Sequence, residues 1–75
     1  MPTLTRLANG KIAMYANDHG EPHFHVEAPD GRCSVSIARM VVIVGAVERS
    51  LLDEALAWAK LNQETLHARW RELNP

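Results

Sequence analysis

The chain has 75 residues, of which 47% are hydrophobic, a formal net charge of −1 and a single cysteine. This length predicts one domain over residues 1–75 with a single core, and one cysteine excludes an intrachain disulfide. The near-neutral charge lacks the basic bias of a dedicated nucleic-acid binder, and no apolar run approaches the roughly 20 residues of a membrane helix. Because the sequence also lacks a signal-peptide pattern, we expect a cytoplasmic protein.

The first predicted hairpin surrounds an Asn-Gly pair. Apolar and polar residues alternate over residues 3–7 and 11–16, as in half-buried β-strands. Asn9-Gly10 favours a two-residue turn between these strands, because both residues tolerate positive φ. This turn would pair Leu7 with Ile12 and Thr5 with Met14.

A second predicted hairpin joins residues 23–28 to residues 32–37 through Asp30-Gly31. The expected cross-strand pairs are Ala28 with Cys33, Glu27 with Ser34, Val26 with Val35, His25 with Ser36 and Phe24 with Ile37. Every apolar residue then faces an apolar one, which places Cys33 in the core. His23 and His25 lie on the opposite face, which we expect to be polar and exposed to solvent.

The second half of the chain predicts one more strand and a helix. Residues 40–44 form a continuous apolar run, which indicates a strand covered on both faces or an edge hidden by a partner. Ser50 to Asp53 has the form of a capping box, so we expect a helix from Leu51 onward. Its apolar stripe consists of Leu52, Leu56, Ala59, Leu66, Trp70 and Leu73. The predicted class is α+β: an antiparallel meander sheet of four or five strands with one long C-terminal helix, roughly 35 Å, packed on its apolar face.

This helix is apolar on more than one side, since Leu51, Trp58 and Leu61 fall outside the main stripe. A 75-residue chain is too small to bury a helix on two sides, so the pattern indicates a protein partner or a homo-oligomer. The candidate partner-binding residues are Leu51, Trp58, Leu61 and Trp70.

Three of the four histidines fall within seven positions, and three interpretations stay open. The first is a site for zinc or another divalent transition metal, formed by His23 and His25 with His19 as third ligand and Asp18 or Glu27 nearby. The second is metal-independent cleavage of RNA, with His23 and His25 as general acid and base. Its candidate cations for the phosphate are Arg32, Lys11 and Arg39. The third is that the histidines are ordinary polar residues on a solvent face.

The segment Asn17-Asp18-His19-Gly20-Glu21-Pro22-His23-Phe24-His25-Val26 strongly resembles the hallmark of a bacterial family catalogued as domain of unknown function 4160. The start Met1-Pro2-Thr3 and the helix residues Trp58, Asn62, Leu66 and Trp70 are similar to the family pattern as well. The resemblance implies a small cytoplasmic protein, often encoded beside another short domain in arrangements like toxin-antitoxin pairs. It assigns no reaction and directs attention to His19, His23, Phe24 and His25.

A local similarity concerns the second hairpin. The stretch GEPHFHVEAPDGR followed by CSVSI resembles the hairpin of HicA-type RNA-cleaving toxins, whose catalytic histidine lies on a strand. The chain departs from that pattern because it lacks their N-terminal helix and their Gly-Ser before the histidine. The small size of the chain, the surplus apolar surface of its helix and the gene arrangement that the family resemblance implies favour a protein-interaction module of a toxin-antitoxin-like or regulatory pair. A ribonuclease and a metal-binding protein are the alternatives.

Overall fold

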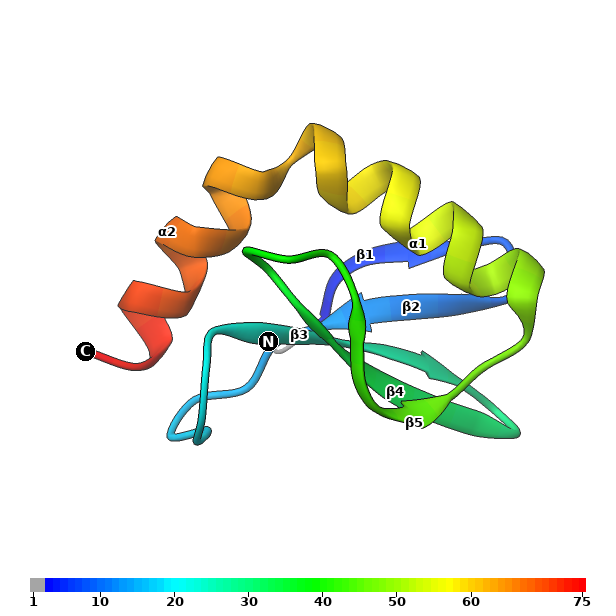
Figure 1. The fold of residues 1–75 in the computed structure, drawn as a ribbon, viewed down its shortest axis with the longest axis horizontal. Helices are drawn as coiled ribbons and strands as arrows, with labels where there is room; N and C mark the ends of the chain where they lie inside the picture. The colour runs from blue at the N-terminus through cyan, green and yellow to red at the C-terminus, as the bar shows by residue number, and fades with distance from the viewer. Residues whose placement is uncertain (1–2) are drawn as a thin grey trace.

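The computed structural model describes residues 3–75 as a five-stranded antiparallel sheet beneath two helices (Figure 1). The strands are β1 (Thr3–Leu7), β2 (Gly10–Ala13), β3 (His23–Ala28), β4 (Gly31–Ser36) and β5 (Val42–Ala46), and the helices are α1 (Arg49–Leu61) and α2 (Gln63–Leu73). The strands lie side by side in chain order, so the predicted α+β meander is confirmed. Met1 and Pro2, which belong to the family resemblance, lie outside the described residues. Within residues 3–75, neither helix is long and apolar enough to span a membrane.

The prediction of one long helix is wrong, because the helix is interrupted at Asn62. The Asn62 side chain donates a hydrogen bond to the Trp58 carbonyl at 2.8 Å, and its backbone N–H bonds the Ala59 carbonyl. Gln63, the polar residue in the apolar stripe, donates to the Ile37 carbonyl at 2.7 Å and so attaches the start of α2 to the sheet. The chain therefore changes direction at Asn62, and α2 descends toward one end of the sheet (Figure 1).

The predicted capping box at Ser50 is also wrong. Helix α1 begins at Arg49, two residues before the expected start at Leu51, and Glu48, the residue before its first helical position, makes no side-chain capping hydrogen bond. The Ser50 hydroxyl instead donates to the Glu48 carboxylate at 2.6 Å.

The two hairpins form as predicted, but each turn comes one residue earlier than expected. The turn residues are Ala8-Asn9 and Pro29-Asp30, so Leu7 pairs with Gly10 and Ala28 with Gly31. None of these turn residues has positive φ, whereas the predicted turns required it. The pairing therefore shifts by two positions, with Thr5 opposite Ile12, Val26 opposite Cys33 and Phe24 opposite Val35. Because side chains alternate with period two, this shift leaves every side chain on its predicted face.

The hydrophobic core lies between one face of the sheet and the helices. It is formed by Ile12, Met14, Phe24, Val26, Cys33, Val35, Ile37, Leu51, Ala55, Ala59, Leu66 and Trp70. Phe24 and Val26 are fully buried, as the alternation along β3 predicts. Cys33 also lies in the core, as predicted, and burial raises the pKa of its thiol, which disfavours the reactive thiolate.

The opposite face of the sheet is not open to solvent, which corrects the expectation for its polar residues. His23 and Ser34 are each 8% exposed, and Ser36 is fully buried. The β2–β3 connection, residues 14–22, folds back over them, and the Trp70 ring lies 5.0 Å from the His23 ring. The bend at Asn62 lets α2 reach this end of β3, which a straight helix would not do.

Strand β5 forms one edge of the sheet and is the least covered apolar element. Val41, Val42, Ile43 and Val44 are 45, 39, 43 and 63% exposed. Helix α1 packs on β1 and β2, at the other side of the sheet. A register shift in the β4–β5 ladder leaves Ile43 without a partner residue on β4. The apolar run is thus an exposed edge, so the prediction of a strand covered on both faces is wrong, and an edge hidden by a partner stays a prediction.

Gly10 gives a stability prediction. A Cβ atom there would lie 2.5 Å from the Glu27 carbonyl oxygen and 2.9 Å from a Leu51 methyl group, so glycine is required by close packing rather than by a turn. We expect Gly10→Ala to lower the free energy of unfolding by about 1–3 kcal/mol through overpacking. Asn9→Ala, in the exposed turn, should change it by less than about 0.5 kcal/mol. Urea unfolding of both variants checks this, and equal effects would contradict it.

Candidate functional site

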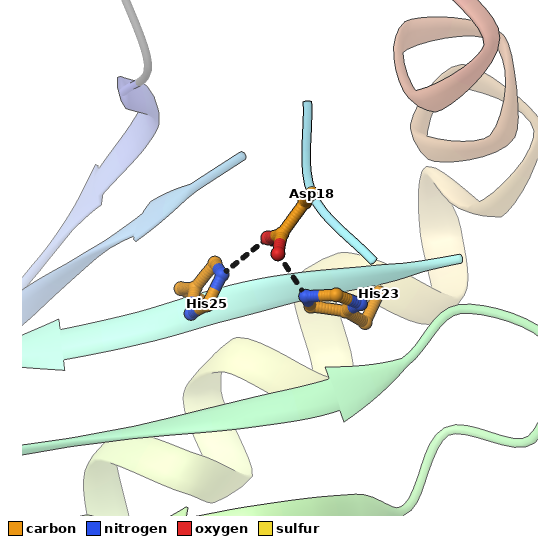
Figure 2. A group of neighbouring side chains, drawn as sticks. All are labelled: Asp18, His23 and His25. Carbon is orange, nitrogen blue, oxygen red and sulfur yellow. Dashed lines mark hydrogen bonds and ion pairs between the residues drawn. The ribbon is translucent and has the colours of Figure 1, made fainter. Parts of the chain in front are cut away.

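The candidate site is built from β3 and the connection that precedes it. Alternation along β3 directs His23 and His25 to the same face, away from the core residues Phe24 and Val26. Asp18 comes from the connection, where Asn17 and Gly20 adopt positive φ and reverse the chain. Its carboxylate consequently lies over the outer face of β3, between the two imidazole rings (Figure 2).

One oxygen of Asp18 contacts both histidines. Asp18 Oδ2 lies 2.9 Å from His23 Nε2 and 3.2 Å from His25 Nε2. The ligand-type atoms of the three residues all lie within 4.8 Å of one another. The side chains of His23 and His25 are only 10% and 14% exposed, and that of Asp18 is 28% exposed. The cluster is thus mostly withdrawn from water but reachable on the Asp18 side.

The hydrogen bonds of His23 restrict where its protons lie. His23 Nδ1 lies 2.8 Å from the Glu21 backbone carbonyl, which can only accept, so Nδ1 carries a proton. A neutral His23 would then present a bare Nε2 lone pair to the Asp18 carboxylate at 2.9 Å. The contact is favourable only if a cation lies between the two atoms, either a second proton on the ring or a metal ion.

His25 is less restricted than His23. Its Nδ1 lies 3.3 Å from the Ser34 hydroxyl, which can donate or accept. The Tyr15 ring packs edge-on against the His25 ring at 5.0 Å, and the Tyr15 hydroxyl donates to Glu27 at 2.6 Å. That hydrogen bond, with partial burial and the Glu27 charge, raises the pKa of Tyr15. Tyr15 therefore stays in its neutral form and packs against the His25 side of the site.

Asp18 is held in its charged form. Partial burial pushes the pKa of Asp18 upward, but hydrogen bonds from His25 and from the His19 backbone N–H, with the His23 charge and hydrogen bond, outweigh burial and lower it. The carboxylate is therefore an anion at neutral pH, as a metal ligand or an imidazolium partner must be.

The connection that carries Asp18 is fastened at both of its ends. At one end, Asn74 accepts a hydrogen bond from the Asp18 backbone N–H at 2.8 Å and donates to the Tyr15 carbonyl at 3.3 Å. At the other, Glu21 pairs with Arg39 and accepts a hydrogen bond from the buried Ser36 hydroxyl at 2.8 Å. The Arg39 and Ser36 hydrogen bonds lower the pKa of Glu21. These contacts keep the carboxylate of Asp18 in place over β3.

The structure brings together only part of the residue set predicted for a metal site. His23 and His25 lie at its centre, whereas His19 is exposed and lies outside the cluster of ligand atoms. Asp18 takes the third position. From the sequence, Asp18 is expected only near the metal ligands, although it stands in the same Asn-Asp-His segment that carries the family resemblance.

The predicted phosphate-binding cations lie around the site rather than in it. Arg32 has a side chain 72% exposed and lies 3.9 Å from the Glu27 carboxylate, while Lys11 lies 3.8 Å from the same residue. Arg39 pairs with Glu21.

The predicted partner-binding residues are divided by the fold. Leu51 and Trp70 are 2% and 8% exposed and belong to the core. The core is where the main apolar stripe predicts Trp70, whereas the sequence pattern predicts Leu51 outside that stripe. Trp58 is partly buried against the core, and Leu61 is 88% exposed at the junction of the helices. The exposed apolar surface of the chain is instead concentrated on residues 41–44.

Comparison with known protein families matches residues 11–71 to the family described as Domain of unknown function (DUF4160). The match includes the connection, β3 and most of both helices, and therefore all three residues of the Asp18–His23–His25 cluster. No curated protein and no solved structure is similar enough to count as a match.

The lowered pKa of Asp18 gives a pH prediction for the metal-free protein. The carboxylate stabilises the fold above its unfolded-state pKa of about 3.9, and this contribution is lost as the pH falls through the lower pKa of the folded state. We expect wild type to be more stable than Asp18→Asn at pH 5, with the difference shrinking toward pH 3. Urea unfolding measures it, with exposed Asp53→Asn as control. A difference that grows in acid would contradict the prediction.

Proposed function

The chain belongs to the family described as Domain of unknown function (DUF4160), and we propose that it binds a divalent transition-metal ion through Asp18, His23 and His25. The observation that carries the proposal is the contact of His23 Nε2 with a carboxylate while His23 Nδ1 is committed to a backbone carbonyl. A metal ion would supply the positive charge that this contact needs.

The distances support the proposal. Two ligands that each lie about 2.0–2.2 Å from one ion are about 2.8–3.6 Å apart, the shorter values for neighbouring octahedral positions and the longer ones for tetrahedral positions. The separations of 2.9 and 3.2 Å between Asp18 Oδ2 and the two Nε2 atoms lie within this range. Small movements of the side chains would therefore suffice to admit an ion.

The surroundings of the three residues also suit metal ligands. In metal sites the second ring nitrogen of a ligating histidine usually donates to a carboxylate, a backbone carbonyl or water, all of them oxygen acceptors. Here the Glu21 carbonyl holds His23 and the Ser34 hydroxyl contacts His25. Two imidazoles with one carboxylate suit Zn²⁺ or Fe²⁺, and three protein ligands leave a position for water.

The geometry gives less support to the ribonuclease alternative. A general acid and base must reach the RNA from either side of the scissile phosphate. His23 and His25 are instead nearly buried, and both direct Nε2 toward Asp18, whose charge would oppose a phosphate. Arg32 contacts Glu27 and not the histidines.

A second proposal concerns association, and it rests on strand β5. We propose that β5 pairs with β5 of a second copy of this chain. Residues 40–47 contain no charged residue, so an antiparallel pair about a two-fold axis would place no like charges opposite one another at its centre. Exposed edges of this kind are templates for strand addition. The irregularity at Ile43 interrupts the ladder, so we expect the dimer to be weak and concentration-dependent.

Metal binding predicts a stoichiometric ion. Titration of metal-free protein with Zn²⁺, followed by calorimetry and elemental analysis, should give one ion per chain. His25→Ala and Asp18→Asn should each weaken binding by more than about 10-fold, because each removes a ligand. His19→Ala is the matched control, since it removes a neighbouring histidine outside the cluster, and it should bind as wild type does. No Zn²⁺ binding by wild type, or equal losses in all three variants, would overturn the proposal.

Self-association predicts a mass that depends on concentration. Light scattering coupled to size exclusion should show wild type shifting toward a dimer at high concentration, and Val44→Lys should stay monomeric, because it places like charges at the pairing edge. Leu61→Lys is the matched control, since Leu61 is more exposed than Val44 but lies on the helices. A wild type that is monomeric throughout, or that associates only with a different protein, would count against pairing of two copies.

A further inference from the structure

We infer that Asn74, at the end of α2, is a positioning residue of the metal site, and that binding of the ion and docking of α2 stabilise each other. This inference rests on the proposed function, since it names a residue that regulates the same three ligands.

Asn74 contacts the Asp18 segment with both ends of its side-chain amide. Its Oδ1 accepts from the Asp18 N–H at 2.8 Å, while its Nδ2 donates to the Tyr15 carbonyl at 3.3 Å and to the Trp70 carbonyl at 3.4 Å. The amide therefore joins the backbone on either side of residues 16 and 17 to the last turn of α2. No other side chain within residues 3–75 is hydrogen-bonded to the backbone of Asp18.

A second contact reaches the site from the same helix. The Trp70 ring lies 5.0 Å from the His23 ring, and Trp70 is only 8% exposed. Helix α2 thus packs against one ligand and holds the backbone of another. The two ligands are five positions apart in the chain, but the helix that fixes their relative placement begins 38 positions after His25.

These contacts couple α2 to the ion. If α2 leaves the sheet, the connection loses its two hydrogen bonds with the Asn74 side chain, and the Asp18 carboxylate becomes free to move away from the imidazoles. Coupling between two sites is reciprocal, so whatever α2 adds to metal affinity, the metal must add to the docking of α2. Outer-shell residues that hold ligands in place commonly contribute about 10–100-fold to metal affinity.

The first test compares Zn²⁺ binding by Asn74→Ala and wild type. We expect about 10-fold weaker binding by the variant, with one ion per chain retained because the three ligands are still present. Arg71→Ala is the matched control, since Arg71 is exposed in the same turn, and it should bind as wild type does. Binding by Asn74→Ala within twofold of wild type would overturn the inference and leave the proposed function standing. Absence of Zn²⁺ binding by wild type would instead overturn the proposed function.

The second test needs no variant and separates positioning from folding. Hydrogen exchange of the wild type is followed with and without Zn²⁺ at two places. One is the backbone N–H of Asn74, which donates to the Trp70 carbonyl, and the other is the backbone of α1. We expect Zn²⁺ to slow hydrogen exchange at the end of α2, by about the same factor as the Asn74→Ala substitution weakens Zn²⁺ binding. The slowing in α1 should be smaller. Equal protection of both helices, or none in α2, would overturn the coupling.

Discussion

The arrangement of the site depends on one hydrogen bond, from His23 Nδ1 to the Glu21 backbone carbonyl. That bond commits the proton of a neutral imidazole to the side away from Asp18. The opposite nitrogen, Nε2, then lies 2.9 Å from the Asp18 carboxylate, and the His23 side chain is only 10% exposed. A buried contact between two lone pairs is costly, so the site requires a cation as part of its stable state.

The rest of the fold can be understood as the means of holding that contact. A connection of nine residues between two strands has no helix or strand of its own to fix it. It is fixed instead from distant parts of the chain: by Asn74 after α2, by Ser36 at the end of β4, and by Arg39 shortly after that strand. The interruption at Asn62 has a function in this arrangement, because it turns α2 toward β3 and brings Trp70 and Asn74 to the connection.

Local patterns predicted the strands and their faces, since alternation decides which side chains of β3 enter the core whatever the turn type. They did not predict the exact turns, because the Asn-Gly and Asp-Gly signals assume positive φ, and Gly10 is required by the approach of Glu27 and Leu51 instead. They also missed the bend at Asn62, since Asn is compatible with a helix and the contact that attaches the start of α2 to the sheet, from Gln63 to the Ile37 carbonyl, joins residues 26 positions apart. The contact of Asp18 with the two histidines could not be predicted from the sequence, because it depends on a hydrogen bond between Asp18 and Asn74, which lies 56 positions away.

We propose that a cation joins His23 to Asp18 and that a metal ion can take this role. Long-range ¹H–¹⁵N correlation spectra of the histidine rings, recorded without and with Zn²⁺, distinguish a proton from a metal ion at His23 Nε2. We expect that His23 keeps its proton on Nδ1 in both spectra and that its Nε2 carries a proton without Zn²⁺ and a metal ion with it. A neutral His23 protonated on Nε2 alone, unchanged by Zn²⁺, would contradict it.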